Sequence, residues 1–301
     1  MAFMAASIFR RMAARPDKVS AKGEVAVNPI KCVCCSNASS RAQNFCIVPQ
    51  AATIASMQPP SRSDAPAQSL CACLSAPHAC PYLAKQQARM LLVAPQETIT
   101  TGIYAQLLEQ GFRRSGGMVY RPRCSGCDAC LSLRVDVNRF APNRSQRRAF
   151  RQHSTLHARM LPLAFDPEHY ALYQAYQQAR HAEGDMAHDD ADGYHDFMLN
   201  SPIDSALVEF RDANNALKIV ALIDLLPQAL SAVYTFYADE PHTAYGTYAV
   251  LWQIAQAQRL QLPHVYLGYW IAHSHKMHYK ARFRPCEIWK GGCWQPVIND
   301  R

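Results

Sequence analysis

The stretch "ALVEFRDANNALKIVALIDLLPQALSAVYTFYA", residues 206–238, contains three strand-like segments in succession. Segments 206–211, 216–226 and 229–238 are rich in Val, Ile, Leu, Phe and Tyr, the residues that favour strands. Turn-forming residues separate them, first Asp212-Ala213-Asn214-Asn215 and then Pro227-Gln228. Because the connections are short, the pattern predicts an antiparallel meander.

Helical segments flank this meander. Asp166-Pro167-Glu168 is a strong helix start and leads into HYALYQAYQQARH, and a second helix is expected over 192–199. After the meander we expect an amphipathic helix at 248–261, a buried strand at 264–271 and a short basic helix at 274–281. This order predicts an α+β fold whose domain at 153–301 is similar to N-acetyltransferase-like (GNAT-like) domains.

The first half of the chain predicts a smaller domain, residues 67–152, which is Cys-rich and basic. We expect a helix at 98–110 with Thr98 as its cap, two short strands around Ser115-Gly116-Gly117, and a strand at 131–140. Residues 1–66 are rich in Ala, Ser and Pro without sustained periodicity, so we expect a disordered extension there.

Charge is distributed unevenly along the 301 residues, whose formal net charge is +8. Residues 111–152 contain ten Lys and Arg against two Asp and Glu, whereas residues 153–260 contain five against fourteen. Such segregation suits a polyanion held at one face, and a solvated basic face without a partner is the alternative. A helix starting near Ser145 would present a set of exposed arginines as phosphate contacts: Arg144, Arg147, Arg148 and Arg151.

Three cysteines, Cys124, Cys127 and Cys130, follow one another with C-x2-C-x2-C spacing. Twelve cysteines without a secretory signal point to a reducing compartment, where thiols bind metals, react or pack. Such a series is similar to cluster-binding segments, which need one more ligand, and Cys80 could supply it. The options are a structural or regulatory zinc or iron–sulfur site, or plain reduced thiols.

The sequence contains no apolar segment that approaches the roughly 18 residues needed to cross a bilayer. Its first residues place arginines after a short apolar stretch, which is the wrong order for a secretory signal. We therefore expect no membrane partner and a cytoplasmic location.

Six blocks of sequence carry a family resemblance, in the expected order between about Pro77 and Trp294. These blocks are YRPRCSGCDAC (120–130), NRSQRR (143–148), ARHAEGDM (179–186), LSAVYTFY (230–237), GTYAVLWQI (246–254) and KMHYKARFRP (276–285). Together they resemble the bacterial leucyltransferase branch of the arginyl-tRNA–protein transferase family. Residues 1–66 have no recognised counterpart.

The resemblance implies transfer of leucine from leucyl-tRNA to the N-terminal amine of proteins beginning with Asp or Glu, which marks them for degradation by the N-degron pathway. It implies aminoacyl-tRNA and such proteins as partners, with Arg144, Arg147, Arg148 and Arg151 holding the tRNA. The transfer chemistry itself needs no cofactor. Eukaryotic relatives are associated with an iron–sulfur cluster, although their cysteine spacing differs from that of Cys80, Cys124, Cys127 and Cys130.

The expected reaction is aminolysis of an ester, in which the acceptor's own amine is the nucleophile. A free α-amine has a pKa of about 7.7–8.0, so a modest base or a water relay suffices. Asp224, within the apolar strand IVALIDLL, is the first candidate base, and its alternative role is to cap the turn at Pro227. Glu209 is the runner-up, with a salt bridge as the alternative. Tyr234 could donate to the oxyanion or simply pack.

Recognition of the acceptor's side-chain carboxylate calls for cations of fixed geometry. Four lie in and around KMHYKARFR, just after the strand where a GNAT-like cleft would open: Lys276, Lys280, Arg282 and Arg284. They could equally hold the tRNA acceptor end. His181, Glu183 and Asp185 are expected to line the cleft or to cap a helix.

Other functions remain open at this point. Arginine could replace leucine as the donated residue. A CoA-dependent acetyltransferase of the same fold would need a Gly-rich loop before the central helix, and PHTAYGTYAVLW offers only Gly246. A non-enzymatic, metal-containing RNA-binding protein would leave the second half unexplained.

Overall fold

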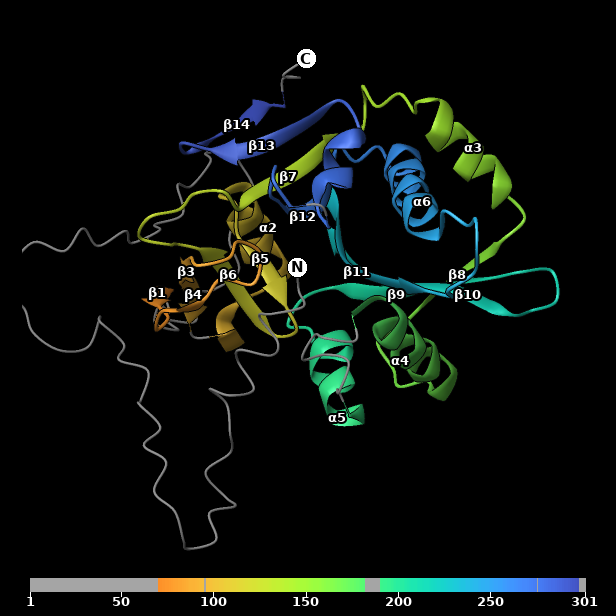
Figure 1. The fold of residues 1–301 in the computed structure, drawn as a ribbon, viewed down its shortest axis with the longest axis horizontal. Coiled ribbons are helices and arrows are strands. Elements are labelled where there is room, and N and C mark those ends of the chain that lie inside the picture. Colours follow the sequence, from red (N-terminus) through yellow and green to blue (C-terminus); the bar gives the residue numbers. More distant parts are fainter. Residues whose placement is uncertain (1–69, 95, 182–189, 275, 298–301) are drawn as a thin grey trace, which may run out of the picture.

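The computed structural model describes residues 70–94, 96–181, 190–274 and 276–297 (Figure 1). The predicted disordered extension at 1–66 lies outside the described residues, as do Glu183 and Asp185. In the part that is described, no helix is long and apolar enough to cross a membrane.

A large eight-stranded sheet forms the centre of the described fold, with the order β14-β13-β7-β12-β11-β10-β9-β8. Neighbouring strands are antiparallel except for β11 and β12, which are parallel. The strands are β7 (Leu131–Asp136), β8 (His157–Leu161), β9 (Ser205–Arg211), β10 (Leu217–Leu226), β11 (Ala229–Tyr237), β12 (His264–Trp270), β13 (Cys286–Lys290) and β14 (Cys293–Pro296).

The predicted meander is confirmed as β9, β10 and β11. Successive residues of β10 face opposite sides of the sheet, as the pleat requires, and both faces are buried. Val220 and Leu222 pack on one side, and Ile219 and Ala221 on the other. A strand covered on both faces reads as a continuous apolar segment, which explains the composition of residues 217–226.

Helices cover both faces of the large sheet (Figure 1). On one face, α6 (Tyr245–Arg259) packs on the strands, and α3 (Arg144–Gln152) packs on α6. On the other face, α4 (Pro167–His181) and the short α5 (Ala191–Tyr194), continued by η3 (His195–Leu199), bury an aromatic cluster around Tyr173 and Phe197. The helix that connects β11 to β12 is α6.

A second, four-stranded sheet has the order β1-β4-β6-β5 and packs beside the large one (Figure 1). Its strands and associated elements are β1 (Cys71–Leu74), β4 (Met90–Ala94), β5 (Arg113–Ser115), β6 (Met118–Pro122), the β2 (His78–Ala79) and β3 (Gln87–Ala88) pair, η1 (Gln96–Thr98) and α2 (Thr101–Glu109). Tyr104 and Leu108 of α2 share a core with Leu226 and Tyr266 of the large sheet, so the two sheets are joined by a common apolar interior.

Several predicted boundaries differ from the structure. The first helix begins after Thr100 rather than Thr98, because the Thr100 hydroxyl accepts a hydrogen bond from the Ile103 amide at 3.3 Å. The basic segment at 274–281 is a short 3-10 helix, η4 (His278–Arg282). The strand expected over 131–140 ends at Asp136, and as β7 it belongs to the large sheet although it precedes the boundary predicted at residue 152.

Candidate active site

The large sheet opens between β11 and β12. The two strands pair only from Ala229 to Ser231 against His264 to Tyr266, although both continue for several residues. Each strand also has a register shift at this point, with Val233 as the additional residue of β11 and Leu267 as that of β12. Bulges bend a strand away from its neighbour and are frequent beside active sites. The divergent halves of β11 and β12 therefore form the candidate active site.

Lys280 of η4 lies at this opening. Its Nζ donates to the carbonyl oxygen of Tyr269 at 3.0 Å and lies 3.4 Å from where a Cβ on Gly268 would be. Gly268 has φ of +78°, a conformation that glycine adopts without strain. Burial, together with the nearby charge of Arg113, lowers the pKa of Lys280 to about 7.

The other three cations predicted for the acceptor carboxylate point elsewhere. Lys276 is exposed. Arg282 lines an open pocket of about 460 Å³ together with Tyr279 and other residues of 272–282. Arg284 donates to the carbonyl oxygens of Ala281 at 3.0 Å and Val297 at 3.2 Å. Lys280 is thus the member of this set whose side chain is hydrogen-bonded to β12 in the described structure.

Asp224 is completely buried and forms an ion pair with Arg114 of β5. Its Oδ1 also accepts a hydrogen bond from the Ser205 hydroxyl at 2.9 Å. Sequence analysis expected a buried carboxylate here to be paired or functional, and the structure provides the pair. The contact connects the small sheet to the large one, and the carboxylate is already neutralised by Arg114. A role as base has no geometric support.

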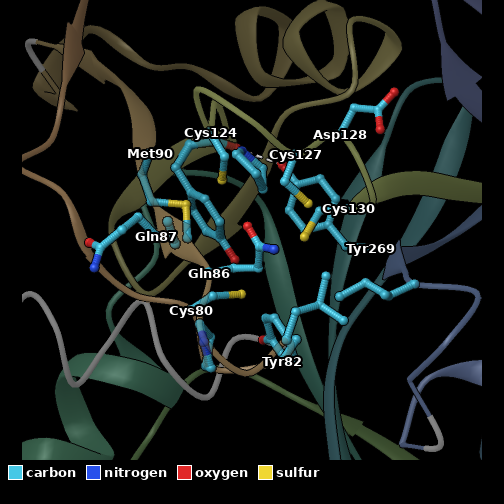
Figure 2. Close-up of a pocket in the computed structure, with 16 residues that line it drawn as sticks. Cys80, Tyr82, Gln86, Gln87, Met90, Cys124, Cys127, Asp128, Cys130 and Tyr269 are labelled. Carbon is cyan, nitrogen blue, oxygen red and sulfur yellow. Dashed lines mark hydrogen bonds between the residues drawn. The ribbon is translucent and has the colours of Figure 1, made fainter.

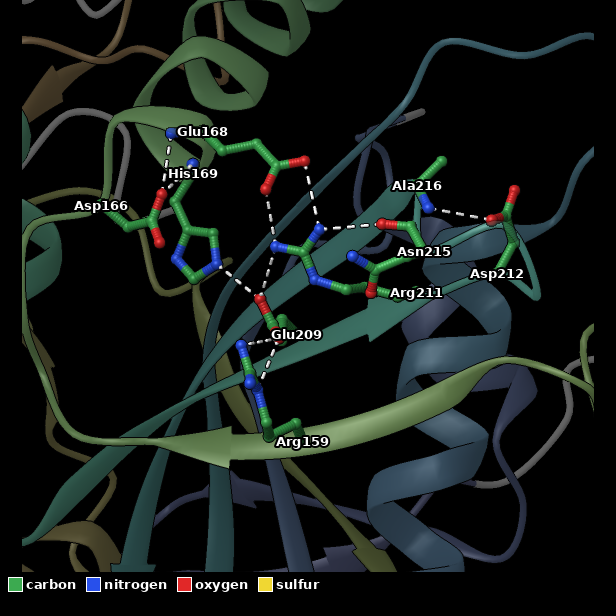
Figure 3. A network of polar contacts seen from close by, with 9 residues as sticks. All are labelled: Arg159, Asp166, Glu168, His169, Glu209, Arg211, Asp212, Asn215 and Ala216. Atoms are coloured by element: carbon green, nitrogen blue, oxygen red, sulfur yellow. Dashed lines mark hydrogen bonds and ion pairs between the residues drawn. The ribbon is translucent and has the colours of Figure 1, made fainter.

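Glu209 is likewise buried within a network of charges (Figure 3). Its carboxylate binds Arg159 Nε at 2.7 Å, His169 Nε2 at 3.0 Å and Arg211 Nη2 at 3.1 Å. Burial acts to raise the pKa of Glu209, but the hydrogen bonds from Arg211 and His169 lower it to about 2. The alternative of a salt bridge is therefore the one that the structure shows.

Tyr234, the third predicted catalytic residue, is 7% exposed and packs among aromatic rings. Its ring lies 5.0 Å from that of Phe197 and 6.4 Å from that of Tyr173. The hydroxyl accepts a hydrogen bond from Gln177 of α4 at 3.2 Å. Tyr234 thus supports the wall of the opening next to the bulge at Val233. His181, expected to line the cleft, is the last residue of α4.

The predicted arginine set lies on the outer face of α3. Arg144, Arg147, Arg148 and Arg151 are all exposed, and no ion pair within the described ranges includes them. Asn143 caps the helix through a capping box with Gln146. Gln146 also donates to the Arg282 carbonyl at 3.1 Å, so the basic helix begins beside the segment that holds Lys280.

The four predicted metal-ligating cysteines line one apolar cavity of about 40 Å³ (Figure 2). Cys124, Cys127 and Cys130 lie on one side and Cys80 on the other, and all four are free thiols. Burial and the neighbouring thiols raise the pKa of Cys130 to about 12. Across the described residues, no three His, Cys, Asp or Glu side chains are close enough together to hold a metal ion. The four thiols are the type of donor that a thiolate-binding metal takes, but in this structure the sulfurs are too far apart to share one ion.

Sequence analysis missed Arg113 and Arg114 as individual residues. Both belong to the basic block 111–152, yet each is only 4% exposed. They therefore add nothing to a surface field. One sequence signal could have identified them, namely their position in a short strand directly after an apolar helix. An arginine buried at such a place usually has a partner.

Comparison with known proteins decides the family. A family model described as "Arginine-tRNA-protein transferase, C terminus" matches residues 168–290, and its N-terminal counterpart matches residues 78–148. This chain belongs to the arginine-tRNA-protein transferase family. The expectation of an aminoacyl-tRNA–protein transferase is thus confirmed.

Curated relatives cover most of the transferase. A protein of Chromobacterium violaceum named "Aspartate/glutamate leucyltransferase" is 51% identical over 74% of this chain and 92% of its own length. Proteins with the same name from Thiobacillus denitrificans and Polynucleobacter asymbioticus are 48% and 46% identical over 74% and 75% of this chain, and over 93% of their own lengths. A solved structure, L-PGS from Bacillus licheniformis, covers 56% of the transferase and 48% of its own chain at 8% identity, with a TM-score of 0.38, too low to assign a fold.

Proposed function

We propose that the protein transfers leucine from leucyl-tRNA to the N-terminal amine of proteins that begin with Asp or Glu. The observation that carries this proposal is the shared name of relatives that are 46–51% identical over about three quarters of the chain. The opening between β11 and β12 supports it, because Lys280 lies there and offers a cation to an acidic acceptor. Both substrates are cytoplasmic molecules, and the cytoplasm is our proposed location.

We assign a GNAT-like topology to the large sheet. Its support is the single parallel pair, β11 and β12, which is connected through α6 and separates beyond three residue pairs. By analogy at the level of the fold, we infer that the acyl donor lies where the strands part. The boundary between a small domain at 67–152 and a larger one at 153–301 stays a prediction.

The reaction depends mainly on how the two substrates are oriented toward each other, and it needs no activated side chain. The acceptor nitrogen attacks the ester carbonyl, a C–N bond forms, the ester C–O bond breaks, and the ribose hydroxyl leaves with the proton given up by the amine. Asp224, Glu209 and Tyr234 are buried and already bound, to Arg114, Arg159 and Gln177 respectively, so we infer that they stabilise the fold and do not touch the reacting atoms. Proton transfer then falls to water or to the leaving hydroxyl.

The basic face of α3 is the proposed tRNA contact. Four exposed guanidinium groups on one helix, with Gln146 hydrogen-bonded to η4, would bring the acceptor stem alongside the opening. Exposed arginines without carboxylate partners are available to phosphates at little desolvation cost.

A CoA-dependent acetyltransferase is disfavoured by the residues before α6. Glu240 lies in the connection between β11 and α6, where it accepts hydrogen bonds from Lys218 at 2.7 Å and from Tyr245 at 2.6 Å. A carboxylate beside the helix N-terminus repels a pyrophosphate, which such enzymes hold there.

For the cysteines we propose a bracing role. Cys80, Cys124, Cys127 and Cys130 would hold zinc or an iron–sulfur cluster, which ties the β2–β3 segment to the loop before β7 and supplies no step of the transfer. Metal content of the purified protein, compared with that of Cys127→Ser, tests the idea. Equal metal content in both proteins would contradict it.

A transfer assay tests the main proposal. Leucyl-tRNA and arginyl-tRNA, each labelled on the amino acid, are crossed with peptides that begin with Asp, Glu, Arg or Lys. We expect labelled leucine on the Asp and Glu peptides alone. Transfer of arginine, or of leucine to Arg and Lys peptides, would place the protein in another branch of the family.

A further inference from the structure

Arg113 is a buried cation whose charge is not neutralised by any carboxylate in the described structure. The residue is 4% exposed, and its Nη1 donates to the carbonyl oxygens of Phe112 at 2.5 Å and Leu108 at 3.4 Å. Its Nε and Nη2 atoms are buried without a hydrogen-bond partner. Burial lowers the pKa of Arg113, a sign that the charged form is poorly compensated.

Aromatic rings surround this guanidinium group. It lies 4.9 Å from the ring centre of Tyr266 and 5.9 Å from that of Tyr269, and Tyr104 and Tyr120 are also near. Cation–π contact offsets part of the desolvation of a cation, but a buried charge still needs an opposite charge for full compensation.

Lys280 is a second cation, partly buried, and it contacts one of these tyrosines, Tyr269. Its Nζ binds the backbone carbonyl of Tyr269, whereas Arg113 lies over the ring of that residue. The charge of Arg113 acts on Lys280, and no ion pair among the described side chains includes either residue. Two like charges therefore lie close together beside β12, an arrangement that an anion would stabilise.

The geometry of Arg113 indicates which anion fits. Nε and Nη2 form the side edge of the guanidinium plane, and a carboxylate binds that edge with two parallel hydrogen bonds. The same two atoms of neighbouring Arg114 both donate to Oδ1 of Asp224, so a carboxylate already occupies this edge of one buried arginine in the chain. No carboxylate in the described fold occupies the corresponding edge of Arg113.

We propose that Arg113 and Lys280 receive the side-chain carboxylate of the acceptor's first residue, and that they determine the preference for Asp and Glu. The inference rests on the proposed function. A protein side chain is favoured over an RNA phosphate because Arg113 is almost completely buried, so only a slender group can reach it. The phosphates have exposed cations on α3 instead.

The test uses the full chain, leucyl-tRNA and two pairs of peptides that differ only in charge at the first position, Glu against Gln and Asp against Asn. We expect the wild type to prefer the acidic member of each pair. Arg113→Gln should lower kcat/KM for the Glu peptide at least about 30-fold and remove the preference over Gln. Lys280→Met should lower it about tenfold.

Controls separate the possible outcomes. Lys290→Met, an exposed lysine on β13, should keep the wild-type preference, and thermal unfolding checks that each variant is folded. If Arg113→Gln fails to fold, Lys280→Met still tests the inference. This variant is expected to fold, because it removes a poorly compensated charge. Unchanged Glu-to-Gln ratios in active variants would overturn the inference and leave the proposed function intact. Loss of leucyl-tRNA binding with unchanged ratios would assign the cations to RNA. A wild type that transfers leucine to none of the peptides would contradict the proposed function itself.

Discussion

Arg114 and Arg113 are neighbours on β5, so their side chains leave opposite faces of the strand and reach two different environments. Arg114 meets Asp224 and Ser205 in a closed ion pair between the two sheets. Arg113 meets tyrosines and another cation. The same residue type thus fixes the fold on one side and remains uncompensated on the other. This contrast indicates where a ligand would complete the structure.

The paired side should be the more sensitive to truncation. Asp224→Ala leaves Arg114 buried without a counter-charge, so we expect it to lower the free energy of unfolding by about 3–5 kcal/mol. Urea denaturation at pH 7 measures the loss. Asp239→Asn, which breaks an exposed pair with Arg180, is the matched control and should change the free energy of unfolding by less than about 1 kcal/mol. Equal losses for the two substitutions would contradict the view that the buried ion pair stabilises the fold more than the exposed one.

The Glu209 network should give a smaller loss with a defined pH dependence. Because the pKa of folded Glu209 is about 2, below its ordinary value, its stabilisation is complete above about pH 4.5 and is lost as the pH falls toward 2. Glu209→Gln should therefore be about 2 kcal/mol less stable at pH 7 and equal to wild type near pH 2. Urea denaturation across this range measures the difference, with the exposed Glu97→Gln as control. A stability difference between wild type and Glu209→Gln that stays constant at all pH values would show that the ionised form of Glu209 is not its cause.

On the unpaired side, truncation should stabilise the fold. Burial and Arg113 lower the pKa of Lys280 to about 7, so between this pH and about 10 the unfolded chain binds a proton that the folded chain lacks. The contribution of Lys280 to the wild-type free energy of unfolding therefore rises as the pH increases over that range. Lys280→Met should be about 1 kcal/mol more stable than wild type at pH 7, with the gain lost near pH 10. A destabilised variant at pH 7, measured against Lys290→Met, would show that Lys280 is already compensated.

The exposed arginines of α3 should have the smallest individual effects, visible mainly in their salt dependence. Arg148→Gln should lower tRNA affinity a few-fold and reduce the slope of log affinity against log salt concentration by about one. Arg259→Gln, on the last turn of α6, is the control. Fluorescence titration from low to moderate salt measures both. An unchanged slope for Arg148→Gln would remove α3 from the RNA interface.

Local patterns predicted the meander and the helices between residues 166 and 261, but not β1 to β4, β8, β13 or β14. The segments around 206–238 carry strand-forming residues with short turns between them, and the helix at 167–181 has its proline in the first turn. Such features depend on a few neighbouring residues and can be read from a window of sequence. The start at Thr100 was missed because three threonines lie between residues 98 and 101, and only the hydrogen bond from the Ile103 amide shows which one caps the helix.

The functional residues were harder to predict, since their roles depend on partners far away in the chain. Asp224 is separated from Arg114 by 110 positions, and Glu209 from Arg159 by 50. A carboxylate in an apolar strand signals that a partner or a function must exist, but the sequence gives no indication of which. Lys280 was named among four cations, and only its contact with Tyr269 sets it apart from Lys276, Arg282 and Arg284.

The sequence by itself determined the helices and the strands of the meander between residues 166 and 271, the cysteine series, a basic helix starting near Ser145 and the family resemblance. These follow from residue type and spacing, which the chain carries locally. Only the tertiary structure decided which charges are neutralised, where β11 and β12 separate, and that Arg113 and Lys280 both lie against Tyr269. Compensation of a charge depends on distances between segments remote in sequence, and those distances exist only once the sheets have packed.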